Sequence, residues 1–255
     1  MLVRPRLIPC LSIIDHDLVK TVQFDKPRYL GDPVNAVKIF NEKGIDELCV
    51  LDIRASRNHR APDMGYLADI ASEAFMPLSY GGGITSLDEI ERILFMGYEK
   101  VVINTAFVNN PKLVGEAAGR VGSQSVVVAI DAKSGLFGKC SCFACDGGVK
   151  TGKDPVAMAR LAESCGAGEI LLNSISNDGM MRGYDLDLVN SVARAVNIPV
   201  IACGGAKGVD DFRRVLDAGA HAAAAGSLYV YYGKEKAVLI NAPEERRLFE
   251  VGIYR

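Results

Sequence analysis

The sequence repeats itself at a spacing of 122 residues, and this repeat limits the fold more than any other feature. Asp32-Pro33-Val34 returns as Asp154-Pro155-Val156, and Gly82-Gly83 returns as Gly204-Gly205. The same spacing relates Glu47 to Glu169, Pro77 to Pro199, Asp88 to Asp210, and Thr105 to Ser227. A solenoid repeat is far shorter, at roughly 20–50 residues. The spacing therefore favours two copies of a large α/β unit within one body.

Eight apolar segments of strand length alternate with helical segments. The expected strands are residues 6–12, 46–52, 76–80, 100–104, 125–131, 169–173, 198–202 and 222–226. Asp32-Pro33 and Asp154-Pro155 have the order of a helix start, with Asp as N-cap and Pro in the first turn. Eight β-α units predict a (β/α)8 TIM barrel with a two-fold half-barrel repeat.

We expect one domain over residues 1–255, with half-barrels at about 1–121 and 122–230. Residues 231–255 form an atypical tail, since no final helix is evident over residues 228–243. Two long loops, 13–31 and 133–152, interrupt the pattern at equivalent places, and residues 137–149 could form a small hairpin.

Composition argues against two kinds of function, nucleic-acid binding and insertion into a membrane. The formal charge is −2, whereas a nucleic-acid surface normally needs a basic stripe. No apolar run approaches the ~20 residues that span a membrane, and no N-terminal targeting signal is evident. We expect a cytoplasmic protein with no nucleic-acid or membrane partner and no cofactor.

Two glycine turns with hydroxyl partners predict anion sites. In this fold the carboxyl ends of the strands carry function. Backbone N–H groups at glycine turns and helix starts favour phosphate. The expected phosphate-binding and substrate-binding residues are Gly82, Gly83, Asn104, Thr105, Asp178, Gly179, Gly204, Gly205, Gly226 and Ser227. The alternative is that the glycines only permit tight turns.

Asp131 ends the fifth expected strand, which is a natural place for a general acid or base. Strand-end solvation is the alternative. The equivalent end of the first strand carries Ser12, and Lys20 follows on the first loop.

Four charged residues, Arg6, Glu47, Lys100 and Glu169, precede or start strands. They should ring the opposite, N-terminal mouth, a face that usually serves stability. A solvated salt-bridge ring and a gate to a passage through the barrel both remain open at this point.

The cysteines fit a reducing compartment. Cys140, Cys142 and Cys145 crowd the predicted hairpin and could hold zinc with a fourth ligand such as Asp146. No second CxxC motif or histidine lies nearby, so the prediction is no metal, with these three as weak candidates.

Specific motifs resemble the HisF-type cyclase subunit of imidazole glycerol phosphate synthase over about the first 230 residues. They are Cys10-Leu11, Lys20, Phe24, Gly81-Gly82-Gly83-Ile84, Ile103-Asn104-Thr105-Ala106, Ala129-Ile130-Asp131, Asp178-Gly179, Gly183-Tyr184-Asp185 and Cys203-Gly204-Gly205. The resemblance implies a glutaminase docked at the N-terminal face. It also implies ammonia passing through the barrel to a bisphosphorylated substrate, with Arg6, Glu47, Lys100 and Glu169 as the gate.

One departure concerns catalysis. The family uses two aspartates, and Asp131 matches the second while Ser12 stands in place of the first. Acid–base assistance is worth roughly 10²–10⁴-fold. The ends of the first and third expected strands and the ending Lys236–Asn241 look like a paralogous AglZ/HisF-like branch, linked to acetamidino modification of surface sugars. That branch implies an ATP-dependent sugar amidotransferase as a further partner.

Three hypotheses follow. The first is an ammonia-channelling subunit for acetamidino-sugar formation. The second is a genuine cyclase of histidine biosynthesis, in which Asp15 or Asp178 covers for the lost acid. The third is a non-catalytic scaffold that activates a glutaminase.

Overall fold

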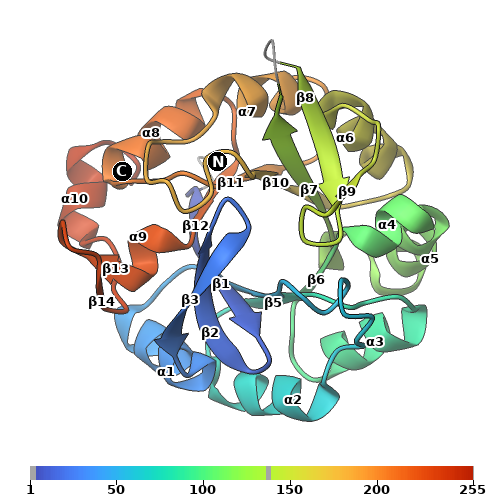
Figure 1. Ribbon diagram of the computed structural model, residues 1–255, viewed down its shortest axis with the longest axis horizontal. Coiled ribbons are helices and arrows are strands. Elements are labelled where there is room, and N and C mark those ends of the chain that lie inside the picture. Colours follow the sequence, from blue (N-terminus) through green and yellow to red (C-terminus); the bar gives the residue numbers. More distant parts are fainter. Residues whose placement is uncertain (1–3, 136–138, 255) are drawn as a thin grey trace.

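The computed structural model describes residues 4–135 and 139–254, and its centre is a closed parallel barrel (Figure 1). The strands are β1 Arg6–Ile14, β4 Leu48–Asp52, β5 Leu78–Gly81, β6 Lys100–Ile103, β7 Val126–Ser134, β10 Glu169–Ser174, β11 Val200–Cys203 and β12 Ala222–Ala225. They are hydrogen-bonded in the order β1-β4-β5-β6-β7-β10-β11-β12, and β12 returns to β1. The predicted (β/α)8 barrel is therefore confirmed.

Helices surround the barrel. They are α1 Pro33–Lys43, α2 Met64–Glu73, α3 Leu87–Phe95, α4 Thr105–Asn109, α5 Lys112–Val121, α6 Pro155–Ser164, α7 Leu186–Ala193 and α8 Val209–Asp217, with a 3₁₀ turn at Ser123–Ser125. Asp32 and Asp154 cap α1 and α6 as predicted, because their carboxylates accept first-turn backbone N–H groups.

The chain after β12 contains little helix, as expected. Short α9 Ser227–Val230 leads into the two-stranded pair β13 Tyr231–Tyr232 and β14 Ala237–Val238, and α10 Glu245–Glu250 follows. Within the described ranges, every helix is too short or too polar to cross a lipid bilayer.

Two apolar layers form the core. The larger lies between strands and helices and includes Phe40, Phe107 and Phe212. The smaller lies inside the barrel and includes Ile8, Val127 and Leu171 beside the small side chains of β12. Burial of these side chains is the main favourable term in folding.

The prediction of an irregular loop at 13–31 was wrong. β1 continues past the barrel to Ile14, β2 Asp17–Val22 pairs antiparallel with it, and β3 Asp25–Gly31 pairs with β2. The turn Gln23-Phe24 has φ angles of 54° and 64°. A two-residue turn of this kind usually contains glycine or asparagine, so the sequence signal for the hairpin was missing.

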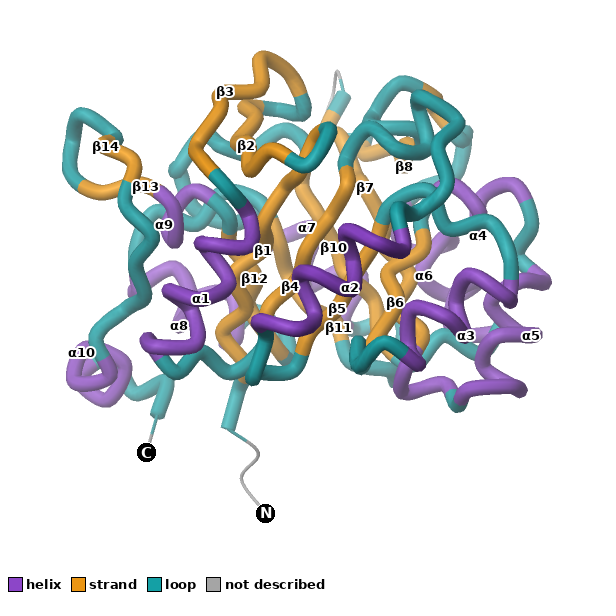
Figure 2. Tube along the Cα trace, turned by 90° about the horizontal axis from the view of Figure 1, so that it is seen from below, coloured by secondary structure: helices purple, strands orange, loops and turns teal. Residues whose placement is uncertain are grey.

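The second loop forms a similar hairpin. β8 Cys140–Ala144 pairs with β7 and with β9 Val149–Lys150. Residues 137–138, where the predicted hairpin starts, lie outside the described residues. Figure 2 shows both hairpins at one end of the barrel and α10 towards the other.

Candidate functional site

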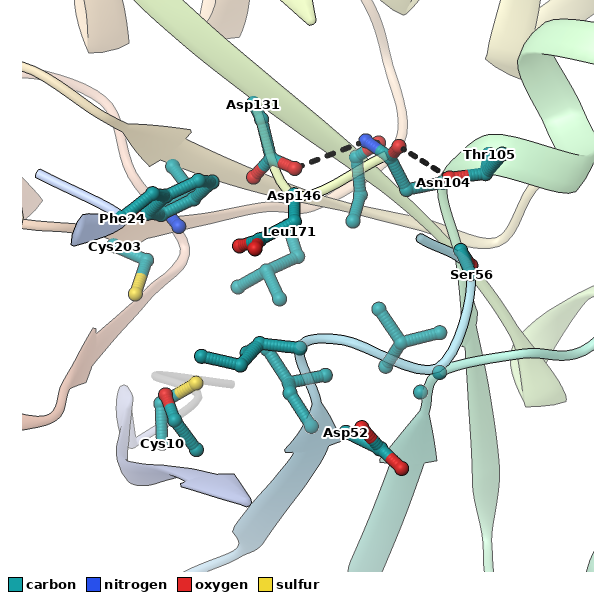
Figure 3. A pocket seen from close by; sticks show the side chains of 18 of the residues that line it. Cys10, Phe24, Asp52, Ser56, Asn104, Thr105, Asp131, Asp146, Leu171 and Cys203 are labelled. Carbon is teal, nitrogen blue, oxygen red and sulfur yellow. Dashed lines mark hydrogen bonds between the residues drawn. The ribbon is translucent and has the colours of Figure 1, made fainter. Parts of the chain in front are cut away.

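A pocket occupies the carboxyl mouth of the barrel, below the two hairpins (Figure 3). Residues from nearly every strand end line it. They include Ser12, Lys20, Asp52, Gly82, Gly83, Asn104, Thr105, Asp131, Asn173, Asp178 and Gly226. The fold thus brings most of the predicted site residues together.

Asp131 lies on β7, beside Asn173 of β10 and opposite Phe143 of β8. Burial raises the pKa of its carboxyl to about 7, although a hydrogen bond from the Asn173 side chain partly offsets this. Asn104 Nδ2 donates to Asp131 Oδ2 at 3.2 Å. A carboxyl group with a pKa near neutrality can both accept and donate a proton, as the prediction for Asp131 requires.

Ser12 lies on β1, paired with Val19 of β2 and Leu51 of β4. It lines the same pocket as Asp131. A serine hydroxyl stays protonated at neutral pH, so it cannot act as the carboxylate that the family pattern has there.

Lys20 and Asp178, predicted as catalytic and substrate-binding residues, are paired with each other. Lys20 Nζ donates to Asp178 Oδ1 at 2.9 Å and to Oδ2 at 3.1 Å, and the Thr21 hydroxyl also donates to Asp178. Lys20 is buried, and its side chain passes over Gly226. The pair fastens the first hairpin over the mouth.

Equivalent glycines stand at the two predicted anion sites. A Cβ at Gly82 would lie 2.5 Å from the carbonyl oxygen of Asp52, and one at Gly204 would lie 2.7 Å from that of Ser174. Both glycines have positive φ, at 130° and 90°. In each half-barrel the glycine backbone passes so close to a neighbouring carbonyl that a side chain would not fit. The same requirement for glycine therefore occurs at both equivalent positions of the repeat.

The first of these sites contains Gly83, Asn104 and Thr105 within the main pocket. The Thr105 hydroxyl accepts a hydrogen bond from Cys145 N–H at 3.1 Å. This hydroxyl therefore anchors the turn between β8 and β9 and is already engaged.

The second site is a small separate pocket. Asp178, Gly179, Gly204, Gly205, Gly226 and Ser227 line it. Ser227 Oγ is buried and has no hydrogen-bond partner among the described residues. A buried polar atom without a partner is unfavourable, and an anion would satisfy it.

The four charged residues at the opposite mouth form a closed ring. Arg6 binds Glu47 at 2.6 Å and Glu169 at 2.7 Å. Lys100 binds the same two carboxylates at 3.1 and 3.0 Å. Each charge contacts two of opposite sign, so the four side chains form one continuous set of ion pairs at the N-terminal end of the barrel.

Two groups of thiols differ in position. Cys10 and Cys203 line the pocket, and Cys10 is paired with Cys49 of β4; the neighbouring Cys203 and Cys49 thiols, together with burial, raise the pKa of Cys10 well above its usual value. Cys140, Cys142 and Cys145 do not converge, and no group of three or more potential ligands is arranged for a metal ion in residues 4–135 and 139–254. Cys142 is buried on β8, so the weak zinc candidates are not supported.

Several lining residues had no assigned role in the predicted site, and two of them stand at positions that the repeat relates to other site residues. Ser56 and Asp146 both face the main pocket. The repeat offered a signal, because Ser56 is the counterpart of Asp178 and Asp146 is the counterpart of Phe24 at a spacing of 122. Asp146 was considered only as a zinc ligand.

The fold and the site define a class: a (β/α)8 barrel with a half-buried carboxyl group and two glycine-lined cradles at its carboxyl mouth. The chain belongs to the family of histidine biosynthesis proteins, whose model matches residues 6–236. This confirms the family named by the motifs.

Curated relatives cover nearly the whole chain. One from Pseudomonas aeruginosa, provisionally named imidazole glycerol phosphate synthase subunit hisF2, is 47% identical over 248 residues, covering 97% of this chain and 99% of its own. One from Vibrio vulnificus, provisionally named subunit hisF3, is 48% identical over 255 residues, covering 98% of each chain. One from Leptospira interrogans, provisionally named subunit HisF, is 46% identical over 244 residues, with 95% and 96% coverage.

Proposed function

We propose that this chain is the ammonia-accepting synthase subunit of a glutamine amidotransferase complex. The proposal rests on one observation: the charged ring and the Asp131 carboxyl lie at opposite ends of the same barrel. The charged ring occupies the N-terminal mouth, and the Asp131 carboxyl lies at the carboxyl mouth. Ammonia entering through the ring would reach the pocket without meeting bulk solvent.

The barrel interior suits neutral ammonia. Ile8, Val127, Leu171 and Ile201 contact the small alanines of β12 there. An apolar lining disfavours ammonium, because an ion loses its hydration without gaining a partner. The interior would therefore select the neutral, nucleophilic form.

The ring is closed in the structure, since all four of its charges are paired. Ammonia transfer requires at least one side chain to swing aside. Lys100 is the natural moving part, because its long side chain turns about several bonds and its amine makes no fork-like contact.

The N-terminal face also carries two exposed aromatic side chains. Phe75 follows α2 and Phe95 ends α3, and they are 87% and 95% exposed. Both side chains are available for contact with a protein partner. We propose that a glutaminase docks here, with its outlet over the ring.

The acceptor is proposed to be a phosphorylated small molecule, bound by its anionic groups at the two glycine cradles. Ser12 favours the branch that serves acetamidino-sugar formation in surface polysaccharides or nonulosonic acids. In that branch an ATP-dependent sugar amidotransferase would be a third component.

A second candidate function is that of the cyclase of histidine biosynthesis, and specific features of the pocket favour it. Asp131 is poised for proton transfer, and both cradles of the barrel are present. The purified chain should be given ammonium chloride and the bisphosphorylated substrate of the histidine pathway. Turnover at ordinary enzyme rates would favour the cyclase and contradict the sugar assignment.

The amidotransferase proposal itself is tested with the cognate glutaminase. The barrel should bind it, and glutamine hydrolysis should rise when the pocket is occupied. If the glutaminase is stimulated equally by a barrel whose pocket is blocked, the chain is a scaffold and not an acceptor of ammonia.

A further inference from the structure

Besides Asp131, the carboxyl groups of Asp52, Asp146 and Asp178 line the pocket, and Asp146 stands outside the family pattern. Asp146 lies in the turn between β8 and β9, and its side chain is only 4% exposed. It lines the same pocket as Ser12 and Asp131, and Figure 3 draws both aspartates at this cavity. The site therefore lacks a carboxylate on β1 but has one in the β8–β9 turn, which lies over the pocket.

The repeat explains how this residue reaches the pocket. Phe24 and Asp146 are equivalent positions, and each lies in a hairpin turn with left-handed backbone. The φ angles are 64° at Phe24 and 56° at Asp146. A Cβ at Gly147 would lie 3.3 Å from the Phe24 ring, so the two turns touch each other over the mouth.

The turn is held in place at three points. Cys145 N–H donates to the Thr105 hydroxyl at 3.1 Å, and Gly148 N–H donates to the Cys145 carbonyl at 3.0 Å. Arg57 lies 3.6 Å from Asp146 Oδ2. Left-handed backbone at non-glycine residues costs of order 1–3 kcal/mol each and concentrates at functional sites.

The electrostatic setting suits proton exchange. Burial raises the pKa of Asp146 to about 6, while Arg57 and Arg54 partly offset this. The Asp146 charge in turn contributes to the raised pKa of Asp131, as does that of Asp178. A nearby negative charge disfavours ionisation of Asp131, so Asp131 can keep a proton near neutral pH while Asp146 is ionised.

We propose that Asp146 supplies the second proton-transfer group of this pocket, in place of the strand-1 acid that Ser12 lacks. The inference rests on the proposed function. In one turnover the ionised carboxylate accepts a proton from the attacking nitrogen, and the neutral carboxyl donates one to the departing oxygen. The pair gains one proton and loses one, so its total is unchanged.

Activity and titration test the proposal separately. Asp146→Asn keeps the size of the side chain, and asparagine tolerates left-handed backbone. With ammonium chloride and the histidine-pathway bisphosphate, we expect the low kcat of the wild-type chain to fall further, by roughly 10²-fold, with KM little changed. The loss should be much smaller in a Ser12→Asp background, where a carboxylate returns to β1.

The second readout needs no turnover. Carbon-detected NMR of the aspartate carboxyls should show the pKa of Asp131 falling when Asp146 becomes asparagine. Asp25→Asn, in the exposed turn of the first hairpin, is the matched control and should change neither readout. A native amide spectrum of each variant excludes misfolding, and Asp146→Ser provides a second substitution.

The outcomes are distinguishable. An unchanged kcat in Asp146→Asn, or an unshifted Asp131 titration, overturns the carboxyl pair. If neither the wild type nor Ser12→Asp turns over the bisphosphate, the cyclase alternative of the proposed function fails. The titration of Asp131 then decides alone whether the pair exists.

Discussion

Lys20 Nζ lies 2.9 Å from Asp178 Oδ1, and this ion pair joins two residues that are 158 positions apart in the chain. Lys20 belongs to the hairpin of the first half-barrel, and Asp178 follows β10 in the second half. Both side chains are largely buried, at 6% and 13% exposure. The pair therefore fixes the roof of the pocket across the two halves.

Breaking this pair should be costly. Lys20→Met leaves the Asp178 carboxylate buried without its ammonium partner, and we expect a loss of about 3–5 kcal/mol of unfolding free energy. Urea denaturation measures it. In a double-mutant cycle with Asp178→Asn, the combined loss should be well below the sum of the single losses. Additive losses would show that the two residues act independently.

Asp131 should make the protein less stable as the pH rises. Its folded-state pKa of about 7 lies above the unfolded value near 4, so the folded protein holds a proton that the unfolded chain has lost. The unfolding free energy contributed by this group therefore decreases between those two pH values. Asparagine does not ionise, so Asp131→Asn should become more stable relative to wild type from pH 5 to pH 8, by a few kcal/mol at about 1.4 kcal/mol per pKa unit. Denaturation at both pH values tests this, and a difference independent of pH would contradict it.

Ser227 should matter only when an anion is bound. Its hydroxyl has no partner among the described residues, so Ser227→Ala removes no hydrogen bond from the unliganded protein. We expect unliganded stability within about 0.5 kcal/mol of wild type, together with weaker stabilisation by phosphate in thermal unfolding. Ser164→Ala, on the outer helix α6, is the control. Equal phosphate protection in Ser227→Ala and wild type would remove this residue from the anion site.

Lys100 should couple the two activities of the complex. Lys100→Ala leaves Glu47 and Glu169 with Arg6 as their remaining cation in the ring. We expect ammonium-driven activity to be largely intact, while glutamine hydrolysis is no longer matched by product formation. Lys38→Ala, which removes an exposed pair with Glu73, should leave the coupling unchanged. Parallel loss of glutamine-driven and ammonium-driven rates would show that the ring is structural.

Ser12→Asp should fold normally and raise cyclase turnover from a low baseline. Residue 12 faces the pocket, so a carboxylate there can remain partly hydrated. Turnover with ammonium chloride and the histidine-pathway bisphosphate is the measurement. Ordinary enzyme rates in the wild-type chain would contradict the low baseline.

The barrel was predictable because its signals are local and repeated. The strand of β7 and the caps Asp32 and Asp154 follow from apolar periodicity and helix-start chemistry within short stretches of chain. The 122-residue spacing then supplied the pairing of the two halves. The first hairpin was not predictable, since Gln23-Phe24 lacks the residues that normally mark such a turn.

The sequence by itself determined which residues stand at strand ends: Asp131 and Ser12 at one mouth, and the four ring residues at the other. Only the tertiary structure decided what each one faces. It paired Lys20 with Asp178, engaged the Thr105 hydroxyl, and brought Asp146 and Asp131 to the same pocket. The reason is that burial and charge proximity depend on the closure of the barrel and the folding of two hairpins over it, and these contacts join residues far apart in the chain.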